Sequence, residues 1–324
     1  MRDLIRNSTA VLLWTALLAT ALAPTAPAAG QDVNFVLPIP DIEVHLRDMS
    51  FEVLEWRGSR MPGDRTQQVV LKYEDDSVLL VKWANAAPGA STFNNEPRYE
   101  VAAYEIQKLF LDYDEYVVPP TVMRAFSMDW VAEQLMDTRA TFREAESVLV
   151  ALQYWLSSVT QDGYWDPHRA REDDVYARHI GNMNVFTYLI HHGDSNVGNF
   201  LISRGQNARI FSVDNGVAFR SPDSDRGTFW RDIQVTRLPE RTIQRLREVT
   251  REDLAQALAV LAEFKVENGQ LVAVPPGENL SPDRGVRRRD GRIQLGLTAL
   301  EIRDIERRRQ ALLRAVDRGS FHIF

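Results

Sequence analysis

The sequence of 324 residues contains no cysteine. Disulfide bonds, thiolate nucleophiles and zinc sites with cysteine ligands are therefore excluded. Lysine is also scarce, because only four of the 38 basic residues are lysine, at positions 72, 82, 108 and 265. The chain uses arginine almost everywhere that a cation is needed, so a lysine in an unusual place indicates a need for a compact ammonium group.

Long blocks of like charge are missing as well. The net charge of −7 and the pI near 5.5 give no electrostatic reason to expect a nucleic acid as partner. The short arginine run at 287–289 is followed at once by Asp290, and we interpret it as a solvated loop. None of the six histidines forms a His-x3-His pair, so a dedicated structural metal site is not expected.

The apolar run at residues 10–23 is too short for a stable membrane span, which needs roughly 20 residues. It follows Arg2 and Arg6 and precedes an Ala-Pro-Ala segment at 26–28. A basic head, an apolar middle and an Ala-x-Ala end are typical of a secretory signal peptide. We expect residues 1–30 to be removed, which leaves an exported protein, periplasmic or secreted, without a stable membrane span. An uncleaved membrane anchor is the alternative.

The rest of the chain divides by pattern into a leader at 31–50, a β-rich part at 51–150 and a mainly helical part at 151–324. Alternating apolar residues and turn residues predict strands at 51–56, 68–73 and 78–83, and helical spacing predicts a helix at 98–111.

Further along, we predict a buried strand leading into a connector at 147–159, a helix at 178–189 and a short strand pair at 200–202 and 210–213. From about residue 236 onward we predict helices. The last of them begins with a capping box of Thr298 and Glu301. The fold class is therefore α+β with two lobes, one β-rich and one mainly helical.

One ordered set of polar residues indicates a reaction. Asp194 and Asn199 lie five residues apart on a loop, and the short hairpin that follows carries Asp214 back toward it. Phosphoryl transfer uses one carboxylate to orient the attacking hydroxyl and accept its proton, and a second carboxylate with an amide oxygen to hold the metal that bridges the phosphates. A purely structural role is the alternative, with an aspartate that caps a helix and an Asn-Gly hairpin turn. It would explain each of these residues separately, but not their order along the chain.

The order HxD-x4-N followed by D-x-G resembles that of protein-kinase-like proteins. The loop from His192 to Asn199 resembles that of the aminoglycoside and choline kinases. The segment Asp-Asn-Gly-Val-Ala-Phe that begins at Asp214 resembles the Golgi secretory-pathway family of casein and xylose kinases. The resemblance implies a two-lobed protein-kinase-like fold, ATP as the phosphate donor, Asp194 as the catalytic carboxylate, and Mg²⁺ or Mn²⁺ held by Asn199 and Asp214.

Lys82 stands inside the apolar run Val-Leu-Leu-Val-Lys-Trp, where a charge is costly without a partner. Glu100 begins the predicted helix at 98–111, and this helix with the Val-Pro-Pro-Thr-Val segment after it resembles the Golgi family. The resemblance implies that Lys82 grips the phosphates and that Glu100 pairs with it. Lys82 on an exposed edge strand is the alternative, and Lys72 and Glu105 are the rival residues.

A loop that covers the nucleotide is expected between the first two strands, where Gly58 and Ser59 can bring backbone N–H groups to phosphate. This loop lacks G-x-G-x-x-G. The backbone of the connector at 147–159 is expected to meet adenine.

The chain also departs from the Golgi family. That family's catalytic loop begins Asp-Arg-His, whereas this chain has Ser195 and Asn196 after Asp194, and it lacks the family's disulfides and any Ala-Pro-Glu segment after Asp214. Three interpretations remain: an exported kinase for a hydroxyl of a secreted protein or glycan, a small-molecule kinase of the aminoglycoside or choline type, and a non-catalytic pseudokinase used for binding. Transfer of a nucleotidyl group in place of a phosphoryl group also remains open.

Overall fold

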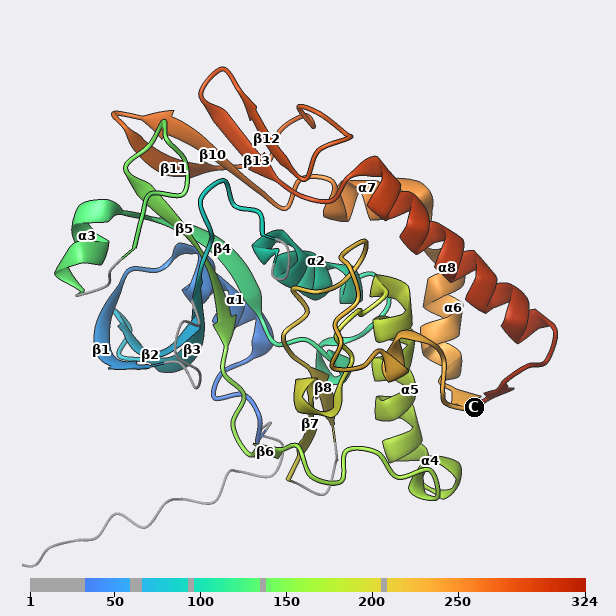
Figure 1. Cartoon of the computed structure of the whole chain (residues 1–324). Helices are drawn as coiled ribbons and strands as arrows, with labels where there is room; N and C mark the ends of the chain where they lie inside the picture. Colours follow the sequence, from blue (N-terminus) through green and yellow to red (C-terminus); the bar gives the residue numbers. More distant parts are fainter. Residues whose placement is uncertain (1–32, 59–65, 93–95, 135–137, 205–208) are drawn as a thin grey trace, which may run out of the picture. The chain divides into compact units, whose positions relative to one another are not determined.

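The computed structural model describes residues 33–58, 66–92, 96–134, 138–204 and 209–324 (Figure 1). The predicted signal peptide at 1–30 and Ser59 lie outside these described residues. All described residues belong to one compact unit.

An antiparallel sheet of five strands holds the first half of the chain together, in the order β1-β2-β3-β5-β4. Its strands are β1 (Phe51–Arg57), β2 (Thr66–Tyr73), β3 (Val78–Asn85), β4 (Thr121–Ser127) and β5 (Ser147–Tyr154). Alternate β3 residues are fully buried, at Leu79, Val81 and Trp83. In the register of the sheet, Lys82 lies between Gln68 of β2 and Gln153 of β5. The predicted strands are confirmed, whereas β4 was not predicted. The boundary expected between residues 150 and 151 falls inside β5.

The leader at 31–50 contains a helix, α1 (Ile39–Asp48), which buries Ile42 and Leu46 completely. Before it, the Asn34 side chain donates a hydrogen bond to the Ser157 carbonyl oxygen at 2.9 Å. The Phe35 ring stacks on Tyr154 at the end of β5, with ring centroids 5.3 Å apart. The leader is therefore an integral part of the core.

Helix α2 (Pro97–Gln107) packs against the sheet and is buried at all but one of its positions. It is the helix predicted at 98–111 and it carries Glu100. After β4 the chain forms the short helix α3 (Met128–Glu133), which is capped by the Ser127 side chain.

The second half contains a core of helices around a small sheet. Its helices are α4 (Arg169–Glu172), α5 (Asp174–Ile190), α6 (Glu240–Glu248), α7 (Arg251–Leu258) and α8 (Ala299–Asp317), with the 3-10 turns η2 (Val197–Asn199) and η3 (Phe229–Arg231). The small sheet has the order β6-β7-β8, made of β6 (Val159–Thr160), β7 (Phe200–Ser203) and β8 (Ile210–Ser212), and β9 (Arg237–Leu238) pairs with β14 (His322–Ile323). The capping box predicted at Thr298 and Glu301 is present. None of the described helices is long and apolar enough to span a membrane.

The prediction of helices from residue 236 onward is wrong for residues 262–295. These residues form a second antiparallel sheet in the order β11-β10-β13-β12, made of β10 (Ala262–Glu267), β11 (Gln270–Val274), β12 (Val286–Arg289) and β13 (Arg292–Leu295). Two hairpin turns, Asn268-Gly269 and Asp290-Gly291, have positive φ at both residues. Asn-Gly and Asp-Gly are the pairs that two-residue hairpins favour, so the signal was present in the sequence. The sheet packs against the five-stranded sheet through a shared apolar cluster that includes Phe264, Leu271 and Leu149.

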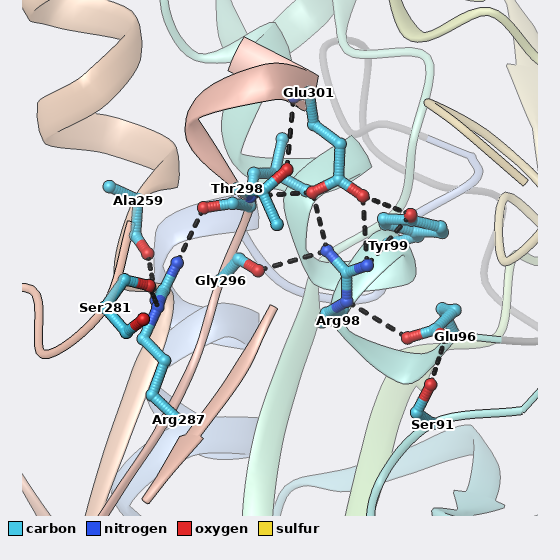
Figure 2. A network of polar contacts seen from close by, with 11 residues as sticks. Ser91, Glu96, Arg98, Tyr99, Ala259, Ser281, Arg287, Gly296, Thr298 and Glu301 are labelled. Carbon is cyan, nitrogen blue, oxygen red and sulfur yellow. Dashed lines mark hydrogen bonds and ion pairs between the residues drawn. The ribbon is translucent and has the colours of Figure 1, made fainter. Parts of the chain in front are cut away.

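The arginine run at 287–289 is not a solvated loop, because Arg287 is 1% exposed within β12. Its guanidinium donates to the carbonyl oxygens of Ser281, Ala259 and Leu297 at 2.5–2.7 Å (Figure 2). Burial lowers the Arg287 pKa to about 10. The sequence prediction failed because a charge with three carbonyl acceptors can be buried, and those acceptors come from distant segments.

A neighbouring ion pair fastens α2 to the N-terminus of α8. Arg98 donates to the two carboxylate oxygens of Glu301 at 2.8 and 3.0 Å, and both side chains are buried (Figure 2). The same Glu301 carboxylate accepts the Thr298 backbone N–H at 2.7 Å and so completes the capping box. The helix that carries Glu100 is thereby fixed at its N-terminal end.

Candidate active site

A cavity of about 840 Å³ opens between the five-stranded sheet and the helical half. This volume is in the range of small-molecule sites. Its wall combines Gly58 with residues of β2, β3, α2, the end of β5, β6 and the segments around β7 and β8. Among them are Gly58, Lys82, Glu100, Gln153, Asp194, Asn199, Asp214 and Arg226. Of the residues predicted for the site, all but the undescribed Ser59 line this one cavity.

Lys82 projects from β3 to the floor of the cavity. Its Nζ lies 3.0 Å from Glu100 Oε1 and also contacts Asp214 Oδ1. Burial disfavours the ammonium form, but the Asp214 and Glu100 carboxylates outweigh burial and raise the Lys82 pKa. Lys82 is therefore a fixed cation with two acidic partners.

The two rival residues lie elsewhere. Lys72 pairs with Asp76 at 2.8 Å near the β2–β3 turn, and its side chain is 41% exposed. Glu105 pairs with Lys108 at 2.8 Å on α2. Neither residue lines the cavity.

Glu100 uses its second carboxylate oxygen to hold the turn that carries Asp214. Glu100 Oε2 accepts the backbone N–H of Asn215 at 3.1 Å. The Asn215 side chain is fully buried and accepts a hydrogen bond from the Ser212 hydroxyl at 2.8 Å. Asp214 itself has a φ of 57°, a left-handed conformation that needs such support. One carboxylate thus joins α2, β3 and this turn.

Asp214 lies at the bottom of the cavity, where 58% of its side chain is exposed to the open space. The nearby Lys82 ammonium lowers the Asp214 pKa, so the carboxylate is charged at neutral pH.

Asp194 follows α5 on a short loop and is 4% exposed. Its Oδ1 accepts a hydrogen bond from Asn196 Nδ2, and its Oδ2 accepts one from Asn199 Nδ2, each at 3.0 Å. The Asp194 backbone N–H donates to Nδ1 of the buried His192 at 3.3 Å. Burial lowers the His192 pKa to about 4, so the ring is neutral and can accept this bond. His192 therefore holds the loop backbone.

Asn199 and Asp214 fit a divalent cation. Asn199 Nδ2 is committed to the Asp194 backbone oxygen at 2.8 Å, which leaves the amide oxygen as the available ligand atom. The Val213 N–H donates to the Asn199 carbonyl oxygen at 2.9 Å and brings the two residues together. No group of three or more His, Asp or Glu residues able to hold a metal occurs in the described part of the chain. One carboxylate and one amide suit an Mg²⁺-type ion that arrives with phosphate oxygens as further ligands.

Two polar residues that contact Asp194 were not predicted. Arg226 Nη2 lies 3.7 Å from Asp194 Oδ2, and the Arg226 side chain is 72% exposed at the rim. Asn196 stands inside the recognised loop, but no role was assigned to it. Spacing could not indicate Arg226, because the irregular segment after Asp214 brings it back to the cavity.

The connector forms the cavity wall next to Lys82, through Gln153, Tyr154, Trp155 and Leu156. No residue of the connector was named from the sequence. Gly58, the residue after β1, also lines the cavity.

No protein-family model matches the chain, and no curated protein matches it. Among solved structures, the chain is similar to a crystal structure of the Golgi casein kinase, with 14% sequence identity, a TM-score of 0.50, and coverage of 87% of this chain and 77% of that chain. The chain has a protein-kinase-like fold. The five-stranded sheet with α2 is its N-lobe, and the helical half is its C-lobe. The predicted fold class is confirmed.

Two further structures are similar at lower scores. The structure of hydra Fam20 with sugar has 14% identity and a TM-score of 0.49, covering 86% of this chain and 88% of that chain. The Golgi casein kinase with Mn/ADP bound has 12% identity and a TM-score of 0.48, covering 86% and 75%.

Proposed function

We propose that the chain is an ATP-dependent phosphotransferase that acts on a hydroxyl group. The observation that carries this proposal is the convergence of Lys82, Glu100, Asp194, Asn199 and Asp214 on one cavity of a protein-kinase-like fold. These residues come from four separate segments. Their fixed hydrogen-bond partners supply the positioning on which phosphoryl transfer depends.

The residues have distinct roles in the proposed step. Asp194 accepts the proton of the acceptor hydroxyl. The hydroxyl oxygen forms a bond to the γ-phosphorus of ATP, while the bond from that phosphorus to the oxygen that remains on the β-phosphate of ADP breaks. Lys82, held by Glu100, binds the phosphates that remain on ADP. Asn199 and Asp214 would hold Mg²⁺ or Mn²⁺, which neutralises phosphate charge when bound. The arrangement of amide donors on Asp194 keeps its carboxylate oriented for this transfer.

The signal-like N-terminus supports an exported enzyme, periplasmic or secreted, with a secreted protein or glycan as acceptor. A second candidate is a small-molecule kinase, because the loop from His192 to Asn199 resembles that of the aminoglycoside and choline kinases. The pseudokinase interpretation is disfavoured, because a binding module has no need to keep every polar group of the transfer site.

Transfer is tested with the chain from Gln31 onward and ATP labelled at either the α- or the γ-phosphate. With an acceptor panel of secreted proteins, glycans and amino alcohols, we expect γ-label in the product. Asp194→Asn keeps the shape of the side chain and should still bind ATP, but it should lose transfer by several powers of ten. Incorporation of α-label would identify nucleotidyl transfer instead, and undiminished transfer by Asp194→Asn would contradict the role of Asp194.

A further inference from the structure

Gln153 is a buried polar residue of the cavity wall to which the proposed reaction gives no role. It lies on β5 directly beside Lys82 in the sheet register, and it is 4% exposed. The connector residues Tyr154, Trp155 and Leu156 follow it along the same cavity. A nucleotide with its phosphates at Lys82 would place its base toward this apolar and aromatic stretch.

A chain of hydrogen bonds fixes which end of the Gln153 amide is left over. The Pro119 carbonyl oxygen can only accept, and the Thr121 hydroxyl donates its single proton to it at 2.8 Å. The Thr121 oxygen can therefore only accept from Gln153, and Gln153 Nε2 donates to it at 2.9 Å. This bond uses one of the two Nε2 hydrogens and fixes the orientation of the amide, so Oε1 points away from Thr121.

Oε1 opens on the cavity. No described residue donates a hydrogen bond to it. It is nevertheless accessible to solvent, because it does not belong to the described polar atoms that are buried without a partner. Gln153 lines the cavity, so a ligand group beside Lys82 meets this acceptor oxygen. The amide cannot reverse to place Nε2 at that position without breaking the bond to Thr121.

We propose that Gln153 is the residue that selects the nucleobase, by accepting a hydrogen bond from an exocyclic amino group. The inference rests on the proposed binding of a nucleotide in this cavity. Adenine carries such an amino group at position 6, whereas hypoxanthine and guanine carry a carbonyl oxygen there and would leave two acceptors facing each other. A buried acceptor without a donor disfavours binding by roughly 10- to 100-fold.

The test compares the dissociation constants of ATP and ITP, with GTP as a third ligand, in the presence of Mg²⁺. ATP and ITP differ only at position 6 and the adjoining ring nitrogen. We expect the wild-type chain to bind ATP about 10- to 100-fold more tightly than ITP. Thr121→Val removes the hydroxyl at nearly constant shape and frees the amide to turn, so this ratio should fall by about tenfold, chiefly through tighter binding of ITP. Gln153→Leu should lower the ratio as well, chiefly through weaker binding of ATP.

Thermal unfolding shows whether each variant is folded. Thr121→Val and Gln153→Leu act through different contacts, so either variant alone can test the inference if the other does not fold. Equal binding of ATP and ITP by the wild type, or ratios in both variants within twofold of the wild-type ratio, would overturn the inference while leaving the nucleotide site in place. Failure of the wild type to bind any of the three nucleotides would overturn the proposed function, and this inference with it.

Discussion

Glu100 links three parts of the site through one carboxylate, since Oε1 contacts Lys82 at 3.0 Å and Oε2 accepts the Asn215 N–H at 3.1 Å. Its sequence neighbour Glu105 has a similar side chain but pairs with Lys108, away from the cavity. The two residues are five positions apart on α2, and this spacing places their side chains on different faces of the helix.

Glu100→Gln should reduce kcat/KM for ATP on the order of 10²-fold, because the neutral amide no longer fixes the Lys82 ammonium or its geometry. Steady-state transfer rates measure this loss. Glu105→Gln is the matched control on the same helix and should leave kcat/KM within about twofold. Equal losses in the two variants would mean that the effect is one of helix stability.

His192 predicts a dependence of stability on pH. Burial lowers its pKa from the ordinary 6.5 to about 4 in the folded protein. Between these two values the unfolded chain binds the proton more strongly, so the free energy of unfolding falls as the pH falls from 6.5 toward 4. This contribution is complete above pH 6.5 and amounts to roughly 3 kcal/mol.

His192→Asn keeps an acceptor for the Asp194 N–H but cannot titrate in this range. Urea unfolding at pH 7, 5.5 and 4.5 should therefore give a smaller loss of stability in the variant than in the wild type. His168→Asn removes a histidine whose side chain is 73% exposed, and this control should follow the wild type. Parallel curves for the wild type and His192→Asn would contradict the assignment.

At the scale of elements, α2 and α8 are held together at their N-terminal ends by the buried pair of Arg98 and Glu301 (Figure 2). Glu301 also caps α8 together with Thr298. Glu100 lies two residues after Arg98 on α2. The Arg98–Glu301 pair therefore bears on the position of the Lys82–Glu100 ion pair as well as on stability.

Glu301→Gln should lower the free energy of unfolding by about 3 kcal/mol, because the buried Arg98 guanidinium loses its two-point contact with a carboxylate and keeps only Glu96. Thr298→Ala removes only the cap and should cost about 1 kcal/mol. Chemical denaturation of both variants gives the comparison. A cost for Glu301→Gln no greater than that for Thr298→Ala would show that the ion pair adds nothing beyond the capping box.

Elements with a local signal could be predicted from the sequence, and those without one could not. Periodicity and caps gave β1, β2, β3, α2, α5 and α8. The hairpins of the second sheet also carry a local signal, at Asn268-Gly269 and Asp290-Gly291, but the surrounding charged residues obscured it. Strand β4 holds Arg124 between apolar residues, and its pairing with β5 becomes evident only in the sheet.

The same distinction applies to the candidate site. Asp194, Asn199 and Asp214 could be proposed because short loops and one hairpin keep them close together in sequence. Lys82 could be proposed because a lone lysine in an apolar run needs a partner, and Glu100 was indicated as that partner by the resemblance to the Golgi family. Arg226 and Gln153 could not, because their place in the cavity depends on the packing of distant segments.

At the scale of the whole molecule, the leader joins the two lobes behind the connector. The Phe35 ring stacks on Tyr154 of β5 and meets Phe211 of β8 edge-on, with ring centroids 5.3 and 5.9 Å apart. Asn34 is hydrogen-bonded to the connector at Ser157. Cleavage of the predicted signal peptide at or before residue 30 would leave both contacts intact.

Phe35→Ala should destabilise the protein by about 3 kcal/mol or more, since it removes a buried ring that touches both lobes. Val36→Ala, at a neighbouring side chain that is 49% exposed, should cost less than about 0.5 kcal/mol. Thermal or chemical unfolding of the chain from Gln31 onward measures both. A cost for Phe35→Ala as small as that for Val36→Ala would mean that the leader does not contribute to the core.

The central claim is that the cavity binds ATP through a metal held by Asp214 and Asn199. Calorimetric titration of the chain from Gln31 onward with ATP, in the presence of Mg²⁺, of Mn²⁺ or of a chelator, tests it directly. We expect saturable binding that requires one of the metals and that is lost in Asp214→Asn, a variant that keeps the shape of the side chain. If the folded wild-type chain binds no ATP with either metal, or if Asp214→Asn binds it as well as the wild type does, the cavity is not the metal-dependent ATP site proposed above.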